Sequence, residues 1–257
     1  MKLWAAIIAL TASPQVRADA SFLERPLIVL RHEIQLHAAY EPLREDTGTN
    51  TADVHRVLLG LDVGVTDEVQ LGLSAAPRIA PNGGFDHLAI RTTYLAHEHV
   101  AVRLDTGVYD TRVHGETPGF AGGIGMSLRI PLLAERVALI SGRFTGLPPI
   151  GPRFSPWPSL SFADDLVTID VNGRVRTASV GIPLGVLVQV VPLLAAQVRA
   201  GYRHVFGAYS SADYVPIGVD LLASTGTMDF IISAEMPRKL QAASNIYEGR
   251  VQLQARF

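Results

Sequence analysis

Residues 247–257, at the end of the chain, read Tyr-Glu-Gly-Arg-Val-Gln-Leu-Gln-Ala-Arg-Phe. The odd-numbered positions are apolar or small and end on Phe257. The even-numbered positions between them are all charged or amide residues: Glu248, Arg250, Gln252, Gln254 and Arg256. Because successive side chains of a β-strand point to opposite faces, the segment predicts a strand with one apolar face and one strongly polar face.

The same period of two recurs along the chain, most clearly in residues 100–109, 123–132 and 194–203. Hydrophobic residues make up 48% of the 257 residues, yet every apolar run after the first is interrupted by charges or glycines. Such a chain can cover its apolar atoms in a soluble β-sandwich core, or turn them toward lipid from a closed barrel. The net charge of −2 argues against a nucleic acid partner, and the lack of cysteine excludes disulfides and thiolate metal sites.

The start of the chain has the layout of a secretory signal peptide. A lysine precedes an apolar run at 3–12, a Ser-Pro break follows, and residues 18–20 are Ala-Asp-Ala. A membrane anchor is the alternative, but the run is too short to cross roughly 30 Å of hydrocarbon at about 1.5 Å per residue. We therefore predict a signal peptide at 1–20 and one exported domain at 21–257.

Short and long connections alternate between the predicted strands. Short turns fall at 66–68, 96–98, 133–135, 191–192 and 224–226, and longer connections at 41–53, 78–86, 110–118, 147–175, 207–213 and 237–246. Bacterial outer-membrane barrels have short periplasmic turns, longer outer loops and an even number of strands. The alternation predicts about twelve strands. Their spans are 27–40, 54–65, 69–78, 87–96, 99–109, 119–132, 136–146, 176–190, 194–206, 214–223, 228–236 and 247–257.

One segment does not fit this scheme directly. Residues 167–171 and 174–177 flank Asn172-Gly173 and read as a β-hairpin with a type I′ turn. They either extend the seventh and eighth strands or form a small hairpin in the longest loop, at 147–175. If they supplied barrel strands of their own, the barrel would have fourteen strands.

The C-terminal strand resembles those of bacterial outer-membrane proteins, a porin-like class. The match covers Tyr247, Val251, Leu253 and Phe257. The resemblance implies an all-β fold: a closed antiparallel transmembrane β-barrel, surrounded by lipid, in the outer membrane of a Gram-negative bacterium. It also implies that the barrel-assembly machinery reads these four residues as an assembly signal. No motif indicates a particular family, and the sequence does not predict an oligomeric state.

A soluble periplasmic β-sandwich is the alternative fold, because its strands also alternate, with the apolar face inward. The predicted polar face is rich in arginine and glycine, whereas the other face is almost entirely aliphatic and aromatic. Lipid-facing bands have this composition, which favours the barrel.

A barrel of about twelve strands is wider than the eight-stranded kind that side chains fill, so water, a loop or long polar side chains must occupy its lumen. The predicted pore-lining residues are Arg91, Arg103, Arg129, Arg143, Arg199, Arg203, Asp62, Asp105, Asp220, Asp229 and Glu235. A basic wall with Arg91, Arg103 and Arg129 would face an acidic wall with Asp220 and Asp229. Charged walls tune the selectivity of a pore, which favours a passive channel for small polar solutes or ions.

The same charges allow a second reading, in which they pair between neighbouring strands and brace a closed barrel. The predicted inward face also carries many glycines, among them Gly60, Gly72 and Gly218. These indicate either open space in the lumen or strand curvature.

Two other functions stay open, although we predict a non-enzymatic protein without cofactors. A rim hydrolase could use Asp86 and His87, or the loop residues His114, Asp164 and Asp165, since a carboxylate beside a histidine can activate water. A structural or adhesion barrel would need only its outer loops. No metal site is predicted, because the histidines at 97 and 99 belong to a solvated turn.

Overall fold

The computed structural model describes residues 22–23, 25–46, 51–80, 84–109, 119–132, 136–140, 165–171, 176–206, 212–240 and 245–257. The predicted signal peptide at 1–20 lies outside this part of the chain, as do residues 147–164 of the longest predicted loop.

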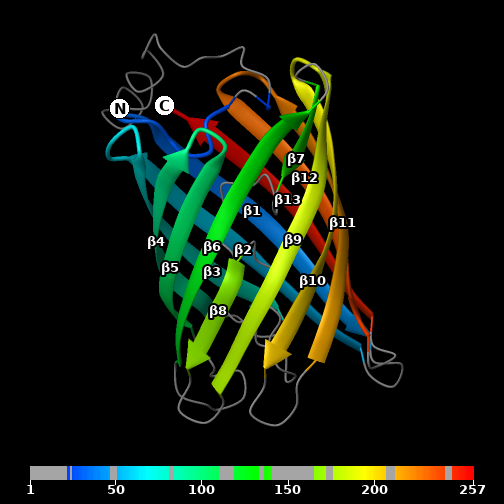
Figure 1. The fold of residues 1–257 in the computed structure, drawn as a ribbon. Helices are drawn as coiled ribbons and strands as arrows, with labels where there is room; N and C mark the ends of the chain where they lie inside the picture. Colours follow the sequence, from blue (N-terminus) through cyan, green and yellow to red (C-terminus); the bar gives the residue numbers. More distant parts are fainter. Residues whose placement is uncertain are drawn as a thin grey trace, which may run out of the picture.

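Thirteen antiparallel β-strands form one sheet in the described residues. They are β1 (Ile34–Asp46), β2 (Thr51–Gly64), β3 (Val69–Ala80), β4 (Gly84–His97), β5 (Val100–Tyr109), β6 (Gly119–Leu132), β7 (Val137–Ile140), β8 (Asp165–Val171), β9 (Arg176–Val191), β10 (Leu194–Phe206), β11 (Ala212–Ser224), β12 (Met228–Lys239) and β13 (Asn245–Arg256). The last strand pairs back onto the first, from Gln35↔Arg256 to Asp46↔Asn245, and closes the sheet (Figure 1). The predicted closed antiparallel barrel is confirmed.

Two of the strands share one position in the wall. Both β7 and β8 lie between β6 and β9: β7 pairs with the end of β6 through Leu132↔Val137, and β8 pairs with its beginning through Phe120↔Val171. Figure 1 shows these two short strands one after the other along this position. Thirteen strands therefore fill twelve positions, as predicted, and fourteen is wrong. The seventh strand, predicted at 136–146, is β7 followed by β8; residues 141–146 lie outside the described residues.

The outer surface of the barrel is apolar and its interior is polar. On β13, Val251 is 56% exposed, whereas Arg250 and Gln252 on either side of it are buried. The same holds around the wall, where the exposed side chains include Leu73, Ile90, Leu104, Ile182, Leu184, Val198, Leu221 and Ile232. These side chains face outward and do not pack against a second sheet, so the sandwich alternative is wrong. An apolar exterior around a polar interior is the pattern of a barrel that spans a lipid bilayer.

Within the described ranges, no helix is long and apolar enough to cross a membrane.

The first strand begins later than predicted. The prediction placed it at 27–40, but β1 starts at Ile34. Just before it, His32 has a positive φ of 69°, and the N–H of Glu33 donates to the carbonyl of Leu30 at 3.0 Å. Residues 27–30 are all apolar and lack the alternation of a wall strand. They form no part of β1, and Ile28 and Val29 are buried.

Candidate functional site

The candidate site is the polar lumen of the barrel. Ten of the eleven predicted pore-lining residues are described, and all ten are buried on the inward face of their strands: Arg91, Arg103, Arg129, Arg199, Arg203, Asp62, Asp105, Asp220, Asp229 and Glu235. Arg143 lies outside the described residues. Buried charges need partners, so the arrangement of the ion pairs distinguishes a lumen with two oppositely charged walls from one in which neighbouring charges pair.

On β4 and β5, one carboxylate holds two arginines. The Nε of Arg91 lies 3.0 Å from Oδ1 of Asp105, and the Nε of Arg103 lies 2.7 Å from Oδ2 of the same aspartate. The ladder places Arg91 directly opposite Asp105, while Arg103 lies two residues from Asp105 on the same face of β5. Two of the three arginines predicted for a basic wall therefore share an acid that belongs to the same wall.

On β10, β11 and β12, one arginine holds two carboxylates. The Nε of Arg199 lies 2.7 Å from Oδ2 of Asp220, and its Nη2 donates to Oδ1 at 3.1 Å. Its Nη1 pairs with Glu235. Gly218 faces this arginine, and a Cβ there would come within 2.7 Å of Nη2. The glycine thus makes room for the guanidinium to lie across β11.

A third cluster, on β1, β2 and β13, centres on an acid that sequence reasoning missed. Glu41 accepts from the Nε of Arg56 at 2.7 Å and also pairs with Arg250. The prediction placed Glu41 in a loop at 41–53, but β1 continues to Asp46 and the ladder sets Glu41 opposite Arg56. The available signal was that two inward arginines, on the strands on either side of β1, required a carboxylate between them.

The predicted separation into a basic and an acidic wall is wrong for these pairs. In these clusters, positive and negative groups lie side by side on the same and neighbouring strands, because each carboxylate or guanidinium binds its nearest oppositely charged groups. Two of the inward glycines do not leave open space either: a Cβ on Gly60 would meet the ring of His37 at 2.2 Å, and one on Gly72 would meet Oδ1 of Asp62 at 2.2 Å. Close pairing of the kind expected of a brace is present along much of the lumen.

Arg129, the third member of the predicted basic wall, has a different role. It lies on β6 near the short-turn rim, where its Nη1 donates to the carbonyl of Phe22 at 2.9 Å, and its Nη2 donates to the carbonyl of Arg25. Asp229, on β12, accepts from Nη1 of Arg25 and from Nη2 of Arg256, each at 2.8 Å. These two predicted lining residues therefore hold the residues that precede β1.

Another polar cluster lies on the outer surface, near the long-loop rim of β10 and β11. Oδ1 of Asp213 lies 2.7 Å from Nδ1 of His204 and accepts from the hydroxyl of Tyr202 at 2.5 Å. The predicted rim candidates are not part of it: His114 and Asp164 lie outside the described residues, as do the side chains of Asp86, His87 and Asp165.

The strand with the predicted assembly signal forms the seam of the barrel. Tyr247, Val251 and Leu253 point outward and are exposed. Phe257 exchanges two backbone hydrogen bonds with Ile34, each at 2.9 Å, and so completes the junction with β1.

No family model matches the sequence, and no curated protein matches it. Solved structures do match. An outer membrane channel from Pseudomonas putida F1 has a TM-score of 0.55 and 9% identity, over 90% of this chain and 97% of that chain. The chain has the fold of an outer-membrane β-barrel. The β domain of the Bordetella autotransporter BrkA (TM-score 0.52, 16% identity, 86% and 98% covered) and LpxR from Salmonella typhimurium (TM-score 0.51, 12% identity, 86% and 99% covered) share it.

Proposed function

We propose that this outer-membrane β-barrel is a channel for small polar or ionic solutes. The observation that carries the proposal is a lumen of twelve strand positions that has clustered arginines and carboxylates on its inward face. The outer membrane channel from Pseudomonas putida F1, which shares the fold, supports it.

Energetics favour a channel over a purely structural barrel. Eight strands suffice for a barrel that side chains fill, so a membrane anchor does not need this width. Buried ion pairs contribute little net stability, because desolvation offsets much of their attraction, and apolar residues of similar volume often serve as well. A lumen that keeps charged side chains despite this cost is suited to the passage of polar solutes.

Conductance across a planar lipid bilayer tests the proposal. We expect discrete current steps from the wild-type protein and a shift of ion preference toward cations on Arg103→Glu, since the lumen then gains negative charge. Arg136→Glu, on an exposed arginine in a short turn, is the matched control and should leave the preference nearly unchanged. A wild-type barrel and variants that all stay electrically silent would contradict a channel.

We also propose three features that follow from an outer-membrane location. Residues 1–20 are removed as a signal peptide, and the exposed band of the wall contacts membrane lipid. The barrel-assembly machinery binds the outward face of β13, where Tyr247, Val251 and Leu253 are accessible. Western blots of fractionated cells, with N-terminal sequencing of the mature protein, test the removal of residues 1–20. Accumulation of a Tyr247→Ser, Leu253→Ser double variant in the periplasm would support binding of β13 by the assembly machinery.

A second candidate function is a hydrolase at the outer rim. The observation that favours it is the contact between His204 and Asp213, because a carboxylate that orients a histidine can prepare it as a general base. Release of fatty acid from outer-leaflet lipid by wild-type protein, abolished by His204→Ala, supports this function. No release by wild-type protein in vesicles of outer-membrane lipid contradicts it.

A further inference from the structure

We propose that the N-terminal segment, of which the structure describes residues 22–23 and 25–30, is a plug in the short-turn mouth of the lumen that keeps the channel closed for most of the time. This inference rests on the proposed function, because a plug matters only if the barrel conducts. Short turns face the periplasm in outer-membrane barrels, so the plug closes the periplasmic mouth.

The segment crosses the lumen from one side to the other. At one end, the N–H of Phe22 donates to Oε1 of Gln189 on β9 at 2.9 Å. At the other end, the N–H of Val29 donates to Oε1 of Gln70 on β3 at 2.7 Å. With β7 and β8 in one position, β3 and β9 are five positions apart in a ring of twelve, which puts them on nearly opposite walls. A segment bound to both must pass across the opening.

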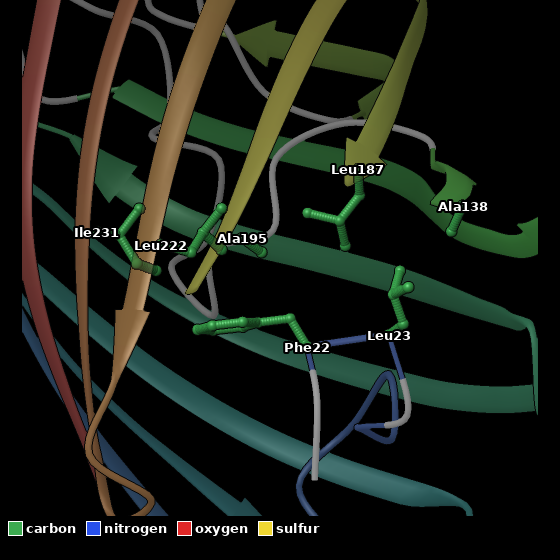
Figure 2. Packing of buried hydrophobic residues seen from close by; sticks show 7 residues of the cluster. All are labelled: Phe22, Leu23, Ala138, Leu187, Ala195, Leu222 and Ile231. Atoms are coloured by element: carbon green, nitrogen blue, oxygen red, sulfur yellow. The ribbon is translucent and has the colours of Figure 1, made fainter. Parts of the chain in front are cut away.

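An apolar pocket in the wall receives the start of the segment. Phe22 is fully buried and Leu23 nearly so. They pack with inward residues of five different strands, as Figure 2 shows: Ala138, Leu187, Ala195, Leu222 and Ile231. These apolar side chains lie in a lumen whose inward face elsewhere carries many charged and amide groups. Phe22 of the segment packs against these apolar side chains and shields them from water. In an open, water-filled mouth they would be exposed to water.

A charged latch holds the segment beside this pocket. Nη1 of Arg25 donates to both carboxylate oxygens of Asp229 at 2.8 Å, and its Nη2 donates to the hydroxyl of Ser224 at 2.8 Å. The guanidinium also lies 4.2 Å from the centre of the Phe22 ring, a cation–π distance. From the opposite side, Arg129 donates to two carbonyls of the segment. Hydrogen bonds from charged groups are the stronger kind, and here both arginines are buried.

The wall is shaped to let the segment pass. A Cβ on Gly64, at the end of β2, would lie 1.8 Å from the carbonyl oxygen of Leu30 and 2.7 Å from that of Val29. The three atoms nearest to that Cβ position all belong to the backbone of the segment. Beyond this crossing, the N–H of His32 donates to the carbonyl of Gly64 at 3.2 Å, and the chain turns into β1. Only glycine leaves enough space here for the two backbones to approach.

Thiol accessibility tests whether the segment is docked. The natural sequence has no cysteine, so Leu23→Cys provides a single reporter in the full chain in lipid vesicles, and Arg31→Cys, at an exposed position, provides its accessible reference. We expect a membrane-impermeant maleimide to label the thiol at position 23 far more slowly than the thiol at position 31. Arg25→Ala should speed the labelling at position 23 roughly tenfold or more, because a buried charge-assisted hydrogen bond is lost. The matched control, Arg31→Ala, should not. If the thiols at positions 23 and 31 are labelled at the same rate when Arg25 is unchanged, the plug is refuted.

Conductance then tests whether docking closes the channel. We expect Arg25→Ala to raise the mean single-channel current over wild type and Arg31→Ala to leave it unchanged. Arg25→Lys, which keeps the charge but loses the two-pronged contact, is the milder second variant and should change both readouts in the same direction. Faster labelling with an unchanged wild-type-like current overturns the plug but leaves the channel in place. Faster labelling with no current from any variant overturns the channel itself, and gating with it.

Discussion

Replacing Phe22 with alanine should release the N-terminal segment by an amount that the structure sets. The ring is fully buried among Ala195, Leu222, Ile231 and their neighbours. Full burial of such a side chain is worth about 1.5–3 kcal/mol, and the Arg25 guanidinium over the ring adds about 0.5–2 kcal/mol. The free energy of docking should therefore fall by about 2–5 kcal/mol, which multiplies the ratio of released to docked segment by roughly 30 to 4,000.

The assay is the labelling rate of Ile28→Cys, a buried reporter six residues away from the substitution. When release and docking are fast relative to labelling, the rate is proportional to the released fraction. We expect Phe22→Ala to raise it by at least one order of magnitude, up to the limit of a free thiol. Leu36→Ala, on an exposed side chain of the outer surface, is the control and should leave the rate unchanged. An equal rate with and without Phe22→Ala would refute the reasoning, because the aromatic anchor would then contribute nothing to docking.

Three further predictions follow from the wall. Gly64→Ala should speed labelling of the Ile28→Cys reporter about tenfold or more, because the new Cβ collides with the backbone at Leu30, whereas Gly122→Ala, whose Cβ would meet only the carbonyl oxygen of Asp105 at 3.7 Å, should not; equal effects of the two would contradict the close crossing. Asp105→Ala should lower the free energy of unfolding in urea-treated vesicles by about 3–5 kcal/mol, because two buried arginines lose their shared carboxylate, and the exposed neighbour Thr106→Ala should stay within about 0.5 kcal/mol. Deletion of Phe257 should reduce the heat-modifiable folded band on gels of outer-membrane fractions, since the seam with Ile34 loses two hydrogen bonds; an undiminished band would show that the terminal residue is dispensable.

The architecture was predictable because a single physical rule governs it. A membrane-spanning strand must turn alternate side chains to lipid, so β13 and its neighbours show their faces residue by residue. Turn lengths then fix the order of strands and the twelve positions. The inward orientation of residues such as Arg91 and Asp220 follows from the same rule. To predict it, one needs to know only whether the residue is at an odd or even position along its own strand.

Pairing partners were harder to predict, because they depend on register between strands. Arg103 is bound by an acid on its own strand, and Glu41 was assigned to a loop because β1 was placed too early. A shift of a few residues at one strand end is enough to hide such a partner. In the sequence, basic residues on some strands and acidic residues on others suggest two separate walls. Strand pairing in the barrel instead brings opposite charges together.

The N-terminal segment could not be predicted from alternation, because it is not part of the wall. Residues 27–30 form a continuous apolar run that fits a buried strand as well as a buried loop. The sequence did hold a signal in Leu187, Leu222 and Ile231, which are large apolar residues at inward positions, where polar residues predominate. Three large apolar groups at the same end of a polar lumen require an apolar partner inside it.

The central claim is that the lumen conducts once its own N-terminal segment is displaced. A single-channel recording tests this claim most directly. It would compare the wild-type protein with a variant in which residues 22–30 are replaced by a glycine-serine stretch of equal length. We expect larger and steadier current steps from the variant than from the wild type. A variant that folds into the bilayer and passes no more current than wild type would contradict the account.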